Sequence, residues 1–439
     1  MGIFFGTDGL RGKVNHELTF DTAKKVGNAL SCVKKNPKVI IGSDTRVSNN
    51  YLMLAVSSGA VAGGATVIDV GIVPTAGVAY ITKELNADFG VVISASHNSG
   101  EYNGIKIFSS DGYKLSDDDE RALERCFIHE KQNCYPHFGN FSQRFNLSKV
   151  YEKHLMSWCE ENLNGLKIVL DLANGASYRI APKIFRSLGA KTIVINGKSD
   201  GVRINEKCGA LYPERLVEKV VKTRADIGFS FDGDADRLIA VTEKGEMVDG
   251  DKILYIFAKH LLLKNELIPK AVVGTSHTNV AIEDELKKMG VELLRTDIGD
   301  KYVLQKMLEK KVKIGGEQSG HIILADKGTT GDGILTAISL CNVIKSSGKK
   351  LSELNTVKLY PQVNKNVLVK DKFRIMNSEE LNREIIKFNA LVGKSGRIMI
   401  RASGTEPIIR VMVESPSKEL NEKVATEIAE KVTDIEKRV

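Results

Sequence analysis

The 439-residue sequence lacks cysteine pairs spaced for zinc binding or for redox chemistry. Its six cysteines are scattered without a C-x-x-C motif, so the sequence predicts reduced thiols, as in a cytosolic protein. Residues 1–20 show no signal-peptide pattern, and the longest apolar stretches, 253–263 and 334–344, are too short to span a bilayer. We therefore expect a cytoplasmic protein with no membrane partner.

The sequence also lacks a strong excess of charge of one sign. It has 63 Lys and Arg against 55 Asp and Glu, a formal net charge of +8, and the two signs are mixed along most of the chain. Nucleic-acid-binding proteins usually concentrate their basic residues, so this pattern favours a solvated surface and no nucleic-acid partner. A local positive potential for an anionic small molecule is compatible with it.

Several catalytic motifs are absent. There is no G-x-S-x-G elbow and no H-E-x-x-H zinc motif. Gly-Lys-Ser occurs at 197–199 and 393–395, but Thr192 and Phe388 stand where a nucleotide P-loop needs its first glycine. These absences argue against serine hydrolase, zinc protease and P-loop chemistry.

A threefold repeat at domain scale organises most of the chain. Three kinds of apolar, strand-like run recur in the same order, and helical patterns lie between them. The runs are 38–44, 64–71 and 87–93, then 167–174, 189–196 and 225–231, then 271–276, 290–295 and 312–315; the helical patterns are 51–62, 178–188 and 280–289. Such strand–helix–strand units predict an α/β protein with three tandem similar α/β domains and mixed, largely parallel sheets.

The pattern changes after Pro361. The remainder predicts a small α+β C-terminal domain, with a helix over 378–388, another from 418, and strands at 364–369, 397–400 and 408–414. We place the domains at 1–148, 149–250, 251–360 and 361–439.

The third strand of the first repeat ends in a small polar loop, 94–100. Ligands of open α/β sheets bind at the carboxyl ends of strands, which makes Ser96 a candidate nucleophile. An alternative interpretation is a serine- and asparagine-rich turn that satisfies its own backbone.

The third strand of the second repeat ends in three alternating carboxylates, Asp232, Asp234 and Asp236. At ~4 Å and an effective dielectric of ~20, each pair of these charges costs about 4 kcal/mol, so a cation such as Mg²⁺ is the natural partner. An acidic surface turn is the alternative, although apolar runs flank the loop. An EF-hand is rejected because Arg237 stands where that loop needs glycine.

Three further segments have compositions suited to ligands. Residues 316–321 form the polar loop of the third repeat, residues 5–12 place Arg11 in a glycine-rich turn, and residues 401–407 combine an arginine, two hydroxyls and a glycine. The last composition suits a phosphate group. Each segment alone is compatible with a purely structural turn.

Together, the order of these motifs resembles the α-D-phosphohexomutase superfamily over essentially the whole chain. The serine loop continues to Lys106 as that family's loop does. Gln318 resembles the phosphoglucosamine mutase branch, because the phosphomannomutase/phosphoglucomutase branch usually has methionine at this position. One departure is Ser99, where the family usually has proline, which puts the rigidity of the loop in question more than its chemistry. The resemblance also implies four domains around a central cleft.

The resemblance implies a role for each motif. Ser96 would be a phosphoserine that gives its phosphoryl group to a sugar phosphate, with one Mg²⁺ per active site held by the three aspartates and a phosphoserine oxygen. Lys106 and Arg11 would flank the transferred group, with Lys106 as proton shuttle and His97 as a supporting contact. Substrate would be bound by Glu317, Ser319, His321, Arg401, Ser403, Gly404 and Thr405.

The implied reaction interconverts glucosamine 6-phosphate and glucosamine 1-phosphate through glucosamine 1,6-bisphosphate, on the route to UDP-N-acetylglucosamine and cell-wall precursors. The expected partner is a small phosphosugar, and a homodimer is left open. Two alternatives stay open as well: a phosphomannomutase/phosphoglucomutase, and a catalytically silent regulator that binds sugar phosphates.

Overall fold

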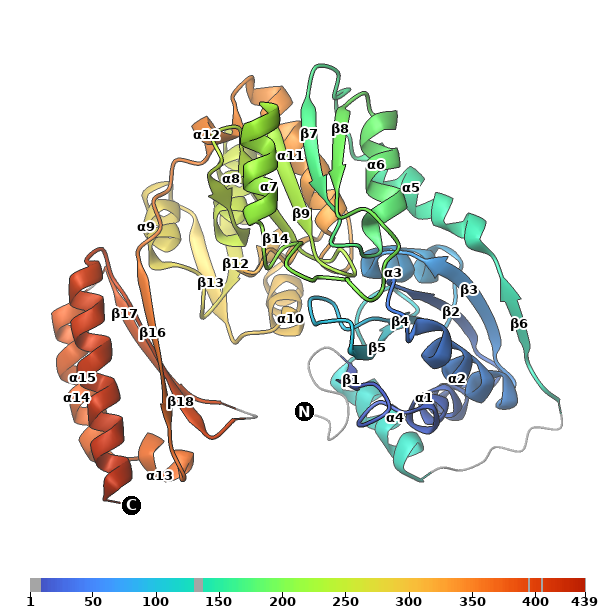
Figure 1. Cartoon of the computed structure of the whole chain (residues 1–439), viewed down its shortest axis with the longest axis horizontal. Coiled ribbons are helices and arrows are strands. Elements are labelled where there is room, and N and C mark those ends of the chain that lie inside the picture. Colours follow the sequence, from blue (N-terminus) through green and yellow to red (C-terminus); the bar gives the residue numbers. More distant parts are fainter. Residues whose placement is uncertain (1–8, 130–136, 394, 404–405, 439) are drawn as a thin grey trace. The chain divides into compact units, whose positions relative to one another are not determined.

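The computed structural model describes residues 9–129, 137–393, 395–403 and 406–438. The chain divides into two compact units (Figure 1). The first comprises Met1–His277 and Leu294–Asn355, and the second comprises Thr278–Leu293 and Thr356–Val439. Among the described residues, no helix is long and apolar enough to cross a membrane.

The first unit begins with a six-stranded sheet in the order β1-β5-β4-β2-β3-β6. Its strands are β1 (Leu10–Lys13), β2 (Lys38–Ser43), β3 (Thr66–Ile72), β4 (Phe89–Ile93), β5 (Tyr102–Ser109) and β6 (Asn140–Gln143), and its helices are α1 (Phe20–Val33), α2 (Asn49–Ala62), α3 (Thr75–Glu84) and α4 (Asp117–His129). Strand β2 runs parallel to β3 and β4, whereas β5 returns antiparallel to β4.

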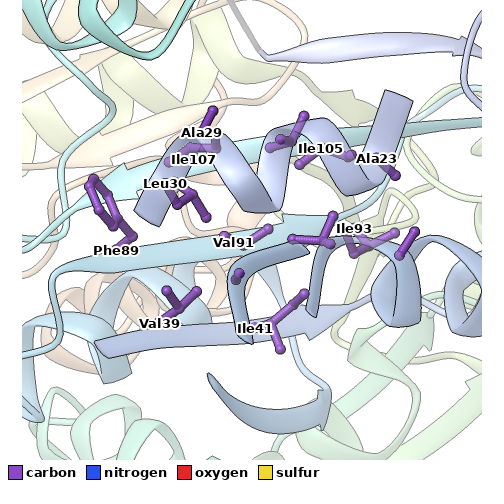
Figure 2. Close-up of a cluster of buried hydrophobic side chains, with 14 of the residues drawn as sticks. Ala23, Ala29, Leu30, Val39, Ile41, Phe89, Val91, Ile93, Ile105 and Ile107 are labelled. Carbon is purple, nitrogen blue, oxygen red and sulfur yellow. The ribbon is translucent and has the colours of Figure 1, made fainter. Parts of the chain in front are cut away.

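Helix α1 packs its apolar stripe on this sheet (Figure 2). Thr19 caps the helix by accepting a hydrogen bond from the Thr22 N–H, and Leu30 is fully buried against the strands. All five residues of β4 are buried, as expected for an interior strand covered on both faces. Each large apolar side chain buried in this way contributes about 1.5–3 kcal/mol, so the serine loop leaves from a rigid base.

The second sheet has the order β11-β10-β9-β7-β8. A connection of η1 (Phe145–Leu147) and α5 (Ser148–Ser157) leads into it, and its elements are β7 (Lys167–Asp171), α6 (Ser177–Ser187), β8 (Lys191–Ile195), α7 (Glu214–Thr223), β9 (Ile227–Phe231), β10 (Leu238–Thr242) and β11 (Met247–Val248). Strand β7 runs parallel to β8 and β9, and β10 returns antiparallel to β9.

The third sheet has the order β13-β12-β14-β15. Its elements are α8 (Gly250–Leu263), β12 (Ala271–Thr275), α9 (Val280–Lys288), β13 (Glu292–Thr296), α10 (Asp300–Lys310), β14 (Ile314–Gly316), β15 (Ile322–Leu324), α11 (Gly333–Ser347) and α12 (Leu351–Leu354). Strand β14 runs parallel to β12 and antiparallel to β15.

The three sheets share one topology, which confirms the predicted repeat. In each, the third strand of the repeat lies beside the first and the second lies on the other side, as β4-β2-β3, β9-β7-β8 and β14-β12-β13. Each third strand ends in the predicted polar loop and is followed by an antiparallel return strand. The prediction of similar α/β units with mixed sheets is therefore correct.

The C-terminal segment forms an antiparallel sheet in the order β16-β18-β17, and α14 and α15 lie together on one face of it (Figure 1). Its elements are β16 (Gln362–Leu368), α13 (Lys372–Met376), α14 (Glu379–Val392), β17 (Arg397–Ala402), β18 (Ile408–Glu414) and α15 (Lys418–Lys437). This confirms a small α+β domain. Helix α9 belongs to the same compact unit, and its Val280 N–H donates to Glu414 Oε1 at 2.5 Å. The division into four domains at our chosen boundaries stays a prediction.

The cysteines differ from expectation in one place. Cys32 of α1 and Cys126 of α4 form a disulfide, so the prediction of six reduced thiols is wrong for this pair. The two residues are 94 positions apart and meet because α1 and α4 pack together, which spacing alone does not reveal. Cys159, Cys208 and Cys341 are free thiols, and Cys134 lies outside the described residues.

Candidate active site

Ser96 lies in the loop that leaves the buried end of β4. Its backbone has φ +50°, in the left-handed region that non-glycine residues rarely occupy, and the residue is 1% exposed. The Ser96 hydroxyl donates to Asp232 Oδ2 at 2.6 Å, and its Oγ lies 3.4 Å from His97 Nδ1. Packing around the loop therefore holds the candidate nucleophile against the aspartate loop of the second repeat.

The three aspartates form a compact buried group. One carboxylate oxygen from each of Asp232, Asp234 and Asp236 lies within 4.8 Å of the others. Among the described residues, Asp234 Oδ1 and Asp236 Oδ1 are buried without a hydrogen-bond donor. Buried carboxylate oxygens need a partner, and a hard divalent cation that prefers oxygen ligands is the partner that suits all three. The geometry fits a Mg²⁺ site.

Lys106 of β5 reaches into the same group. Its Nζ lies 2.8 Å from Asp234 Oδ2 and 3.1 Å from Asp236 Oδ2, and Thr75 Oγ1 donates to Asp234 Oδ2 at 2.6 Å. Burial and the neighbouring carboxylates raise the pKa of Asp232 well above its ordinary value. Burial also acts to raise the pKa of Asp236, but Lys106, His321 and Arg237 outweigh it and hold that pKa well below the ordinary value.

His97 and Arg11 lie beside this group. Arg11 is placed by β1, where it pairs with Gly104 of β5. Burial, with further contributions from Arg237 and Arg11, lowers the pKa of His97 to about 4. His97 is therefore neutral near pH 7, so one of its ring nitrogens donates a hydrogen bond and the other accepts one.

The loop of the third repeat meets the aspartate loop at His321. His321 Nδ1 lies 3.8 Å from Asp236 Oδ2, and its Nε2 lies 3.5 Å from Asp300 Oδ2 at the start of α10. Glu317 Oε1 accepts the Gly299 N–H at 3.0 Å, and Ser319 Oγ donates to Glu317 Oε2 at 3.4 Å. The structure thus brings the polar loops of all three repeats together.

The fourth motif lies in the second unit. Arg401 of β17 is directly opposite Arg410 of β18, and burial together with Arg410 lowers the pKa of Arg401. Lys372 Nζ donates to the Ser403 carbonyl at 2.6 Å. Arg410 is ion-paired with Glu406 Oε2 at 2.7 Å, so Arg401 and Lys372 are the cations of this turn that suit an anionic group such as phosphate. Gly404 and Thr405 lie outside the described residues.

The residues of these sites that were not predicted include Arg237, Thr75, Asp300, Lys372 and Arg410. Arg237 directly follows Asp236 in the sequence, and this position could have indicated that it is a site residue. Thr75, Lys372 and Asp300 belong to no motif, and only the fold brings them to their loops.

Comparison with known families covers nearly the whole chain. Four profiles of the phosphoglucomutase/phosphomannomutase family match: alpha/beta/alpha domain I at residues 2–133, domain II at 148–245, domain III at 249–360, and the C-terminal domain at 365–431. Curated proteins named phosphoglucosamine mutase from Staphylococcus aureus strains JH9 and Mu50 are 44% identical over 445 residues, covering 99% of this chain and 99% of each relative.

Solved structures agree on the fold. A phosphoglucomutase/phosphomannomutase family protein from Burkholderia thailandensis has a TM-score of 0.82 at 23% identity, covering 98% of this chain and 97% of that one. N-acetylphosphoglucosamine mutase from Aspergillus fumigatus, in complex with GlcNAc-6P and magnesium, has a TM-score of 0.69 at 17% identity, covering 99% and 96%. The chain therefore belongs to the phosphoglucomutase/phosphomannomutase family of α-D-phosphohexomutases.

Proposed function

We propose that this protein is a phosphoglucosamine mutase that interconverts glucosamine 6-phosphate and glucosamine 1-phosphate. The observation that carries the proposal is the 2.6 Å hydrogen bond from the Ser96 hydroxyl to Asp232, within a buried group of three carboxylates. The name of the 44% identical relatives supports the choice of amino sugar. The glutamine at position 318, noted in the sequence, points to the same branch.

The proposed reaction has two balanced halves. In the first, a free sugar hydroxyl attacks the phosphorus on Ser96, the bond from phosphorus to Ser96 Oγ breaks, and glucosamine 1,6-bisphosphate forms. In the second, Ser96 Oγ attacks the other phosphate, and the sugar oxygen leaves. Lys106, as an ammonium group, gives a proton to the leaving oxygen and receives one from the attacking hydroxyl. His97 hydrogen-bonds the transferred group as a neutral ring.

We infer that Asp232, Asp234, Asp236 and a phosphoserine oxygen hold one Mg²⁺. The two buried oxygens without donors, Asp234 Oδ1 and Asp236 Oδ1, support this. A bound Mg²⁺ would neutralise charge on the transferred phosphoryl group. The magnesium complex of the Aspergillus fumigatus relative is consistent with the choice of metal.

The remaining motifs are assigned to the substrate. Glu317 and Ser319 would bind sugar hydroxyls, with His321 beside them, and Arg11 would flank the transferred phosphate. Arg401, Ser403, Gly404 and Thr405 would grip the phosphate that is not reacting. The substrate is a small phosphosugar; a cytoplasmic location and a homodimer stay predictions.

The deciding experiment is a side-by-side assay of the purified protein with glucosamine, glucose and mannose 6-phosphates. The proposal expects the highest kcat/KM with glucosamine 6-phosphate. A preference for mannose or glucose would favour the phosphomannomutase/phosphoglucomutase alternative. Binding of sugar phosphates without turnover of any would favour the silent regulator.

A further inference from the structure

Arg46 is a buried arginine whose guanidinium is entirely committed to the serine loop and its base. Its Nε–H donates to Asp44 Oδ2 at 2.9 Å. The remaining four N–H groups donate to backbone carbonyls: those of Ser96 at 3.0 Å, Asn98 at 2.8 Å, Tyr102 at 2.9 Å, and Ser99. All five donors of the guanidinium are thereby used, four of them on residues 96–102.

Asp44 connects the same arginine to the other side of the loop. Its Oδ2 also accepts the Ser94 hydroxyl at 2.6 Å, and Ser94 Oγ in turn accepts the Ser96 N–H at 2.9 Å. Asn49 donates to Asp44 Oδ1 at 2.8 Å and fixes the carboxylate itself. Ser96 is therefore held at its N–H through Ser94 and at its carbonyl by Arg46.

A second repeat reinforces the same carbonyls. The Asn205 side chain donates to the Ser96 carbonyl at 2.8 Å and to the Asn98 carbonyl at 3.0 Å. Asn205 is itself buried and reaches the loop from the connection between β8 and α7. The Ser96 carbonyl thus accepts from two side chains that come from different repeats.

These contacts explain how an unfavourable backbone conformation persists. Ser96 has φ +50°, which a serine adopts only when its surroundings impose it. Ser99 does not restrict the backbone of the loop, whereas a proline at this position would fix its φ angle through the ring. Arg46 lies outside the loop and hydrogen-bonds the carbonyls of residues 96, 98, 99 and 102, which restrains the backbone conformation of the loop.

We propose that Arg46 is a positioning residue for phosphoryl transfer, holding the Ser96 hydroxyl against Asp232 by clamping the carbonyls of residues 96, 98, 99 and 102. This inference rests on the proposed function, in which Ser96 carries the phosphoryl group. Its alternative is that the buried Asp44–Arg46 pair only stabilises the fold. A positioning role predicts a slower phosphorylation of Ser96 when the planar guanidinium is replaced by another positive group, whereas a purely structural role predicts only a loss of stability.

Arg46→Lys makes that separation. Lysine keeps a positive charge beside Asp44 but cannot reproduce the planar fork that binds four carbonyls. The rate at which unphosphorylated Ser96 takes a phosphoryl group from glucose 1,6-bisphosphate, followed by rapid quench and intact mass, should fall about 100-fold, the effect of misplacing a reacting group by about 1 Å. The KM for glucosamine 6-phosphate should change by less than about threefold, because the sugar-binding residues are untouched.

Two variants serve as comparisons. Asn205→Ala removes two bonds to the same carbonyls and keeps the Asp44–Arg46 pair, so it should lower the phosphorylation rate in the same direction by a smaller factor. Asn196→Ala removes a 3.0 Å bond to Asp171 at the end of β7 and none of the side-chain bonds that Arg46 and Asn205 make to the serine loop. It should lower the unfolding midpoint and leave the phosphorylation rate per folded molecule unchanged.

Hydrogen exchange measures the clamp independently of chemistry. Arg46→Lys should speed exchange of the amides of residues 96–102 and leave those of β4 protected. A wild-type rate of Ser96 phosphorylation in folded Arg46→Lys would overturn the inference. So would a decrease in that rate that is fully explained by the fraction of unfolded protein. If Arg46→Lys does not fold, an unchanged rate in Asn205→Ala overturns it. If wild-type Ser96 never accepts phosphate, the proposed function fails, and exchange alone then decides whether the clamp exists.

Discussion

The Ser96 hydroxyl donates a 2.6 Å hydrogen bond to Asp232 although the two residues are 136 positions apart in the sequence. Each lies at the carboxyl end of the third strand of its own repeat, β4 for Ser96 and β9 for Asp232. The repeat therefore does more than build three similar sheets. It delivers equivalent loops to one place, where each carries a different part of the chemistry.

The aspartate group should make activity depend on a divalent cation. We expect a chelator to abolish mutase turnover and Mg²⁺ to restore it, with Asp234→Asn needing a higher Mg²⁺ concentration for half-maximal rate because one charge is lost. Mg²⁺ at about 100 times its Kd should also raise the unfolding free energy of the wild type by about 2.7 kcal/mol. Activity that survives exhaustive chelation would show that the three aspartates are structural.

Lys106→Met should impair both stability and turnover. The ammonium lies 2.8 and 3.1 Å from two buried carboxylates, so its removal leaves uncompensated charge and should cost about 3–5 kcal/mol in denaturant unfolding without metal. Mg²⁺ should recover part of this loss, since it neutralises the same oxygens. Turnover should stay at least about 100-fold lower even with Mg²⁺, because the proton carrier is gone. Full recovery of kcat with Mg²⁺ would assign Lys106 a purely electrostatic role.

Arg401→Ala should weaken substrate binding without preventing Ser96 from accepting phosphate. Loss of an arginine–phosphate contact costs about 1.5–3 kcal/mol, which corresponds to a KM raised about 10- to 150-fold. Arg383→Ala is the matched control, since Arg383 is a solvent-exposed arginine on α14 of the same unit. Unchanged KM together with loss of Ser96 phosphorylation would instead place Arg401 at the reacting group.

Asp332, which lies at the start of α11 beside the aspartate loop, predicts a pH dependence of stability. Burial raises its pKa to about 6, while its carboxylate caps α11 and accepts from Tyr151. Between about pH 4 and pH 6 the folded state therefore holds a proton that the unfolded state has lost, so this group lowers stability as pH rises. Its cost above pH 6 is on the order of 3 kcal/mol.

Asp332→Asn should remove the cost of ionising this buried carboxyl and keep an acceptor for the α11 N-terminus. Relative to the wild type, the variant should gain unfolding free energy between pH 4.5 and pH 7.5, measured in urea at both values. Parallel pH profiles for the two proteins would contradict the assignment.

Strands such as β4 and β9 could be predicted because they are contiguous buried runs that end abruptly in polar loops. Ser96 and the three aspartates could be predicted as site residues for the same reason, because they lie in the polar loops that follow these strands. What the sequence could not indicate is contact between distant segments: Arg46 on the serine loop, the Cys32–Cys126 bond, and Lys372 beside Ser403. These residues stand outside any motif, and only packing of the repeats or of the C-terminal sheet brings them to their partners.

The most direct test of the proposed function is the phosphorylation state of Ser96 itself. The purified wild type, incubated with glucose 1,6-bisphosphate and Mg²⁺, should gain about 80 Da, the mass of one phosphate, with the modification mapped to Ser96 by peptide sequencing. Glucosamine 6-phosphate should then be converted to glucosamine 1-phosphate, with Ser96 phosphorylated again at the end of each turnover, and Ser96→Ala should remain folded, gain no mass and turn over no substrate. Near-wild-type turnover by Ser96→Ala, or a phosphate that maps to another residue, would contradict the account.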